Sequence, residues 1–162
     1  MDNNQYSHSG RIMFIIMWVF FFFLLIVFFY YADSASEGSY HVQNGTVTIK
    51  PDSNGHYRIA GSINSEKVEF IVDTGATLVA IPQTLAKRLE LKGRYPILLQ
   101  TANGNISGSL TRIQKLTFAN FKLYNVKAVI IPGNDDTMVL LGMNVLEQFN
   151  LSQQNKQLII KK

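Results

Sequence analysis

Apolar and polar positions are divided unevenly along the chain. One long apolar run lies near the N-terminus, and only short apolar runs separated by polar turns follow it. The run covers residues 12–31, which are aliphatic and aromatic without one charged side chain. With a helical rise of about 1.5 Å per residue, this run would extend roughly 30 Å, the thickness of the hydrocarbon core of a bilayer. The pattern therefore predicts one transmembrane helix, Ile12–Tyr31.

The apolar run has two alternative interpretations besides a membrane anchor. A buried core helix is disfavoured because no polar face interrupts the run. A cleaved signal peptide has the same order of features, here Arg11, the apolar run and the small residues 32–35. Its apolar region, however, is usually only about 7–15 residues long. We therefore expect an uncleaved anchor.

The charges that flank the run predict its orientation. Arg11 precedes it, whereas Asp33 and Glu37 follow it and the next basic residue is Lys50. Positive residues are enriched on the cytoplasmic side of a membrane helix. We expect residues 1–11 in the cytoplasm and the remainder outside it, in the periplasm of a Gram-negative cell or an equivalent exterior space.

The region beyond the anchor has the pattern of a small β domain. Residues 32–44 are rich in Ser, Gly, Asp and Asn, which is typical of a flexible tether. Residues 45–162 are enough for one compact domain but not for two lobes. Expected strands are 46–49, 56–63, 66–73, 78–81, 95–101, 106–112, 114–118, 121–131, 139–141 and 157–160. Short helices are expected at 82–91, where Pro82 stands at the first position, and at 143–149.

Composition excludes several classes of function. The chain has no cysteine, so disulfides, thiolate catalysis and cysteine-based metal sites are excluded. His8, His41 and His56 lack metal-ligand spacing, and we expect no metal site. The net charge is +4, but Lys and Arg are scattered without a basic stripe, so we expect no nucleic-acid partner. The three Asn-X-Ser/Thr sequences are read as coincidence, because glycosylation needs a eukaryotic secretory route.

One motif carries catalytic chemistry. Asp73-Thr74-Gly75-Ala76 follows the apolar, strand-like sequence 68–72. A tight turn at a strand end fixes a carboxylate with backbone and hydroxyl donors. Hydrolysis of a peptide bond by carboxyl groups alone needs two of them that share a proton. The other candidates for the second carboxyl, Asp52 and residues 135–136, have neither the glycine of the motif nor the apolar strand before it. The second carboxyl is therefore expected from a second copy of the chain, in a homodimer.

With Leu140-Leu141-Gly142 preceding a helix, the motif resembles the retropepsin-like aspartic proteases, in particular the membrane-anchored, single-pass bacterial group. The resemblance covers about residues 45–161 and implies a mainly β fold, a closed barrel forming one acid-protease half with one or two short helices. It implies that Asp73 is catalytic and pairs with Asp73 of the partner copy. It assigns support of the active site to Thr74, Gly75, Ala76, Leu140, Leu141 and Gly142.

The same resemblance makes Asn103-Gly104 the tip of a flap that closes over an extended peptide. The tip has neither the several glycines of viral retropepsins nor the flap tyrosine of pepsins. The expected activity is that of an aspartic endopeptidase on protein or peptide substrates, without a cofactor and favoured by mildly acidic pH.

Two other interpretations of the motif stay open. Asp73 can be a turn aspartate that only bonds its own backbone. Alternatively, the fold is kept without catalysis, as a dimeric module that binds peptides or serves as a scaffold. The substrate and the cleavage preference do not follow from the sequence.

Overall fold

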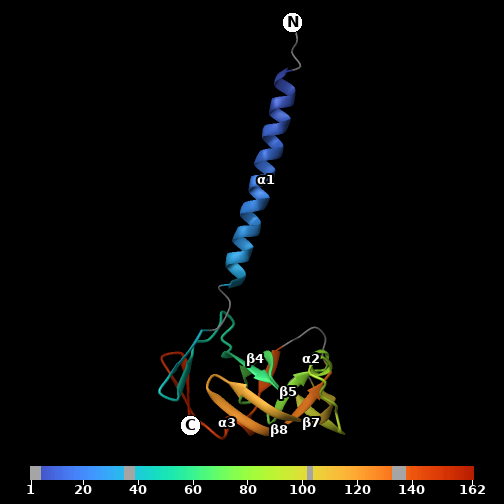
Figure 1. The fold of residues 1–162 in the computed structure, drawn as a ribbon, viewed down its shortest axis with the longest axis vertical. Helices are drawn as coiled ribbons and strands as arrows, with labels where there is room; N and C mark the ends of the chain where they lie inside the picture. Colours follow the sequence, from blue (N-terminus) through green and yellow to red (C-terminus); the bar gives the residue numbers. More distant parts are fainter. Residues whose placement is uncertain (1–4, 35–38, 102–103, 133–137) are drawn as a thin grey trace. The chain divides into compact units, whose positions relative to one another are not determined.

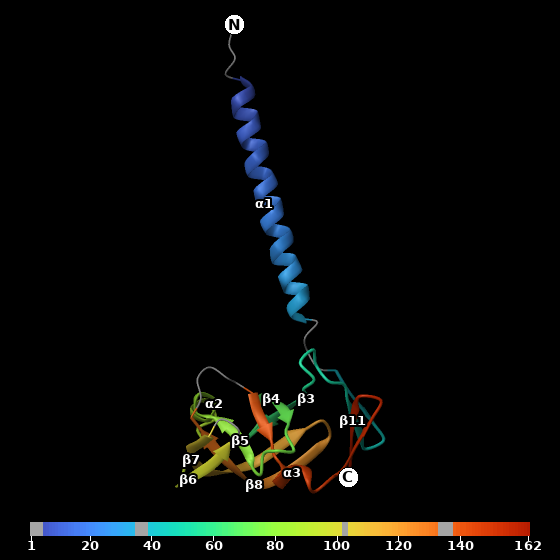
Figure 2. The same ribbon diagram turned by 180° about the vertical axis from the view of Figure 1, so that it is seen from behind.

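The computed structural model describes residues 5–34, 39–101, 104–132 and 138–162. The chain divides into two compact units, Met1–Glu37 and Gly38–Lys162. In Figures 1 and 2, the described residues of the first unit form one uninterrupted helix, and the second unit contains the strands and the short helices.

The first unit is helix α1, Gln5–Ser34. Within it, residues Arg11–Phe28 have a mean hydropathy of 2.7 and include one charged residue, Arg11. This segment is long and apolar enough to cross a bilayer and is compatible with a single-pass anchor. The helix extends past both ends of the apolar run because backbone hydrogen bonds, and not hydrophobicity, decide where a helix stops.

The second unit is mainly β, as the sequence predicts, with two sheets and the short helices α2 (Gln83–Arg88) and α3 (Met143–Leu146). The smaller sheet has the order β1-β2-β11-β10. The larger has the order β3-β4-β9-β5-β8-β7-β6, and an additional β3–β7 pairing closes it into a barrel. The strands are β1 (Tyr40–Gln43), β2 (Thr46–Ile49), β3 (Arg58–Ile63), β4 (Glu66–Val72), β5 (Val79–Pro82), β6 (Tyr95–Thr101), β7 (Gly104–Phe118), β8 (Phe121–Ile131), β9 (Met138–Leu141), β10 (Asn150–Gln154) and β11 (Gln157–Lys161).

Tight turns set the register of three hairpins. Asn44-Gly45 joins β1 to β2, Asn64-Ser65 joins β3 to β4, and Asn155-Lys156 joins β10 to β11, all with positive φ at both positions. Two-residue turns of this kind match the twist of antiparallel strands, and asparagine tolerates the left-handed conformation.

Helices α2 and α3 are shorter than expected, and Pro82 ends β5 and precedes α2 instead of standing at its first position. Three strands also differ from the expected elements. Strand β1 lies within the segment 32–44 that we expected to be a flexible tether, because its backbone pairs with β2. Strand β10 was not expected, since its sequence is polar; pairing with β11 places it at a sheet edge that tolerates polar side chains. Strand β7 runs unbroken through Ile113, where we expected two strands, because β6 pairs with its first part, residues 104–110, and β8 with its second part, residues 109–118.

The barrel core is built by alternation along the strands. In β4, Val68 and Phe70 are buried, while Glu69, which lies between them, and Ile71, which follows Phe70, are partly exposed. Alternate residues of a strand point to opposite faces of a sheet, so β4 has one face in the core and one toward solvent. The helix α3 adds Val145 and Leu146 to the core.

Candidate active site

Asp73 is positioned by the pairing of β4 with β9. These strands are parallel, with Val72 opposite Leu141, and the backbone N–H of Asp73 donates to the carbonyl of Leu141 at 3.2 Å. The ladder thus continues one residue past the end of β4. Alternation then places the side chain of Asp73 on the same, partly exposed face as Ile71.

The turn that follows holds the carboxylate by its own backbone. Asp73 Oδ1 accepts the N–H of Gly75 at 2.8 Å, and the Asp73 carbonyl accepts the N–H of Ala76 at 3.3 Å. Thr74 and Gly75 are exposed. A Cβ at Gly75 would lie 3.2 Å from Asp73 Oδ1, so glycine leaves room for the carboxylate beside the donor N–H. The motif therefore presents one fixed carboxylate at the surface of the chain.

Gly142 brings β9 into direct contact with the far side of this turn. A Cβ built on Gly142 would lie 2.4 Å from the carbonyl oxygen of Leu78 and 2.9 Å from that of Ala76. Both neighbours are backbone atoms that cannot rotate away. The sequence Leu140-Leu141-Gly142 is thus brought together with the Asp73 turn, and only glycine fits at its last position.

Sequence reasoning missed Asn144, which ties helix α3 to the same turn. Its Oδ1 accepts the N–H of Val79 at 3.1 Å, and its Nδ2 donates to the carbonyl of Lys127 at 2.9 Å. Its backbone N–H donates to the carbonyl of Thr77 at 3.1 Å, and the N–H of Met143 donates to that of Ala76 at 2.7 Å. Asn144 therefore joins the Asp73 turn, β5 and β8.

The flap assignment falls only partly within the described residues. Asn103 lies outside them. Gly104 begins β7 with φ of +104°, and its carbonyl accepts a hydrogen bond from Thr101 Oγ1 at 2.7 Å. This hydrogen bond lies within the β6–β7 hairpin. The role of the hairpin as a flap stays a prediction.

The other carboxylates considered from the sequence differ from Asp73. Asp52 accepts a bond from Arg58 Nε at 2.6 Å and is engaged in an ion pair, and residues 135–136 lie outside the described part of the chain. Within the described residues, no group of three His, Asp or Glu side chains is arranged to hold a metal ion. The arrangement can supply one carboxyl group per chain for acid–base chemistry.

Comparison with known proteins places this geometry in a family. The sequence pattern of the family described as gag-polyprotein putative aspartyl protease matches residues 59–148. A solved structure described as a retropepsin-like aspartic protease from Rickettsia conorii is 27% identical, with a TM-score of 0.56 over 76% of this chain and 94% of that one.

Two curated relatives are uncharacterized proteins. One, from Rickettsia prowazekii, is 31% identical over 119 residues, which are 72% of this chain and 51% of that protein. The other, in the cobV 5′ region of a Sinorhizobium species, is 23% identical over 110 residues, 66% of this chain and 47% of that protein. The chain thus spans about half the length of these relatives. Because the family pattern matches more than half of the sequence and the barrel agrees with it, the chain belongs to the gag-polyprotein putative aspartyl protease family and is a retropepsin-like aspartic protease by fold.

Proposed function

We propose that the chain is a membrane-anchored aspartic endopeptidase that acts as a homodimer. The observation that carries this proposal is the single carboxylate of Asp73, held at the end of β4 by the N–H of Gly75. One such group per chain is half of a two-carboxyl site. Membership of the family supports the remainder of the site coming from a second copy.

In the proposed dimer, the two Asp73 side chains face each other across a two-fold axis and share one proton. Two close carboxyl groups cannot both ionise cheaply, so one stays protonated while the other is charged. The ionised carboxylate accepts a proton from water, whose oxygen attacks the peptide carbonyl carbon. The protonated carboxyl donates its proton to the carbonyl oxygen. When the tetrahedral species collapses, the carboxyl that accepted the proton of water passes it to the leaving nitrogen, and one hydroxyl of the tetrahedral species returns its proton to the other carboxylate.

The neighbouring residues have supporting roles in this proposal. Thr74 is exposed and free to reach the backbone of the partner's turn, while Gly75 orients the carboxylate through its N–H. Residues 140–142 pack against the turn that carries Asp73. The hairpin that contains Gly104 would cover an extended peptide and exclude water from it. The substrates are protein segments near the membrane face, including the chain's own segment ahead of β1, residues 32–39.

The test is cleavage of a diverse peptide pool by the 162-residue chain in detergent micelles, from acidic to neutral pH. The Asp73→Asn variant should cut nothing while its sedimentation still shows a dimer. Glu66→Gln is the matched control, because Glu66 is an exposed carboxylate at the other end of β4 and its loss should leave cleavage unchanged. Cuts made equally by the Asp73→Asn variant would refute Asp73 as the catalytic residue.

The dimer and the inactive alternative are separated by the same preparations. A chain that cuts peptides while remaining monomeric at every concentration would exclude the shared site. A folded dimer that binds peptides and cuts none would instead favour the peptide-binding module.

Topology needs a separate measurement, which the lack of cysteine makes simple. A single cysteine in place of Lys162 should react with a membrane-impermeant thiol reagent in intact cells, whereas one in place of Asp2 should not. The opposite labelling pattern would reverse the proposed orientation.

A further inference from the structure

The partly exposed face of β4 and β9 forms an apolar surface beside Asp73. Ile71 and Leu140 are opposite each other in the register of these parallel strands, and both are partly exposed. Ile71 is two residues from Asp73 and therefore on the same face, about 7 Å away along the strand. A peptide held at Asp73 would place a side chain against this pair.

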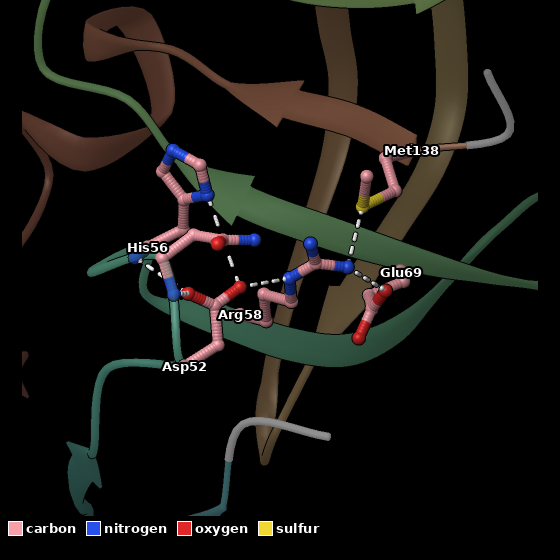
Figure 3. Close-up of polar contacts among 6 residues, drawn as sticks. Asp52, His56, Arg58, Glu69 and Met138 are labelled. Carbon is pink, nitrogen blue, oxygen red and sulfur yellow. Dashed lines mark hydrogen bonds and ion pairs between the residues drawn. The ribbon is translucent and has the colours of Figure 1, made fainter. Parts of the chain in front are cut away.

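The outer end of this surface is occupied by Arg58. Arg58 begins β3 and is directly opposite Ile71, so their side chains are neighbours on one face. Its Nη1 donates to Glu69 Oε2 at 3.1 Å and to Met138 Sδ at 2.8 Å, as Figure 3 shows. Glu69 is on β4 and Met138 is on β9, so the guanidinium reaches across β4 from the neighbouring strand.

A buried carboxylate fixes Arg58 in this position. The side chain of Asp52 is 2% exposed, and its Oδ2 accepts Arg58 Nε at 2.6 Å (Figure 3). Its Oδ1 accepts the backbone N–H groups of Asn54 at 2.8 Å and of His56 at 2.9 Å. His56 Nδ1 is 3.8 Å from Oδ2 and the imidazole is half exposed. Asp52 is thus rigidly held by its own turn and directs the guanidinium over β4.

Stability alone is a weak reason for this arrangement. The Arg58–Glu69 pair is partly exposed and contributes little to folding. Apolar side chains of similar volume can often replace even a buried pair such as Arg58–Asp52 without loss. The network instead places a planar, rigid group at the boundary of an apolar surface next to the proposed catalytic residue. Arginine is suited to this because its fork can bond two neighbours at once.

We propose that Arg58, fixed by Asp52, is a specificity-determining residue: its guanidinium closes the outer end of the apolar surface of Ile71 and Leu140, and so limits the size of the substrate side chain accepted beside the scissile bond. This inference rests on the proposed peptidase function and names the substrate class for that site. Substrates would carry a branched aliphatic residue of moderate size at this position. Larger aromatic side chains would meet the guanidinium.

The test compares Arg58→Ala with the unmodified chain on peptides that differ only in Leu, Phe or Trp beside the scissile bond. We expect kcat/KM for Phe and Trp relative to Leu to rise about tenfold, the size of effect typical of space gained in an apolar pocket. The kcat for the Leu peptide should change less than about threefold, because the surface at Asp73 itself is untouched. Arg58→Lys should stay closer to the unmodified chain, since it retains bulk and charge.

Asp52→Asn provides a second variant that leaves Arg58 in place but weakens its anchor, and it should shift the preference in the same direction. Arg112→Ala is the matched control: Arg112 is an exposed arginine on β7 that bonds only the carbonyl of Asn125, at 3.2 Å, among the described contacts. Arg112→Ala should leave the preference unchanged. A purely structural role of Arg58 would lower stability without changing the order of preference, and that result would overturn the proposal.

Peptide affinities measured in parallel on the Asp73→Asn background separate the two proposals. Cleavage by the unmodified chain with no change of preference in Arg58→Ala would overturn the inference and leave the peptidase intact. A change of preference in binding without any cleavage would support the inference and refute the peptidase. Neither cleavage nor peptide binding by the folded chain would refute both.

Discussion

Replacement of Asn144 by alanine tests whether helix α3 holds the turn that carries Asp73. The change removes two side-chain bonds, one to the N–H of Val79 and one to the carbonyl of Lys127. It keeps the backbone bond from residue 144 to Thr77, because that bond needs no side chain. The expected result is a folded but weakened domain with a displaced turn.

The magnitude follows from the burial of the two partners. Val79 is fully buried, so its N–H has no water to replace the lost acceptor, which costs about 1–3 kcal/mol. Lys127 is exposed and its carbonyl can bond to water, so loss of that bond costs about 0.5–1 kcal/mol. The sum is a decrease of about 1.5–4 kcal/mol in the free energy of unfolding.

Urea unfolding of residues 38–162, which form a compact unit, measures this decrease at one fixed protein concentration. Gln148→Ala is the control, because Gln148 makes one exposed bond, from its Nε2 to the Asn144 carbonyl at 3.1 Å. It should change the free energy of unfolding by less than about 1 kcal/mol.

Activity supplies the second readout for Asn144. A displacement of the reacting groups by about 1 Å can reduce the rate by roughly a hundredfold, so kcat should fall more than stability alone explains. An Asn144→Ala variant within about 0.5 kcal/mol of the unmodified domain, with full activity, would refute the reasoning.

Three further predictions concern glycine packing, pH and association. Gly142→Ala should lower kcat about a hundredfold in the protein that remains folded. Gly61→Ala is the control: its Cβ would lie 2.1 Å from the Thr117 carbonyl oxygen, so this variant should lose stability but keep its kcat. Equal kcat values in the two variants would contradict the role of Gly142. Burial acts to raise the pKa of Asp52, but hydrogen bonds from the His56 N–H, the Arg58 side chain and the Asn54 N–H outweigh it, so the pKa lies below its ordinary value of 3.8. The charge of Asp52 therefore stabilises the fold fully above about pH 4, and this stabilisation decreases as the pH falls toward the lowered pKa. The difference in the free energy of unfolding between the unmodified chain and Asp52→Asn should decrease over that range. A difference that stays constant from about pH 7 to about pH 3 would contradict this prediction. Activity should rise faster than linearly with chain concentration below the dimer dissociation constant, and strict proportionality would argue against a shared site.

Much of the fold follows from local patterns. Alternation identifies β4 and β8, the Asn-centred turns fix hairpin register, and proline followed by helical spacing identifies α2. The strands β1 and β10 carry no such signal, because their polar residues are explained only by the partners they pair with. The continuity of β7 likewise depends on β8, since a strand keeps its course where its neighbour satisfies its backbone groups.

The sequence alone determined the apolar run, the class of fold and the place of Asp73, because each depends on residues adjacent in the chain. Only the tertiary structure decided which distant residues hold the turn that follows Asp73 and which lie along the strands that lead to it. Asn144 reaches β5 and β8, and Arg58 reaches Asp52 and Met138, over contacts that no spacing in the sequence encodes. Hydrogen bonds and packing depend on distances in space, and pairing of β4 with β9 sets those distances for the candidate site.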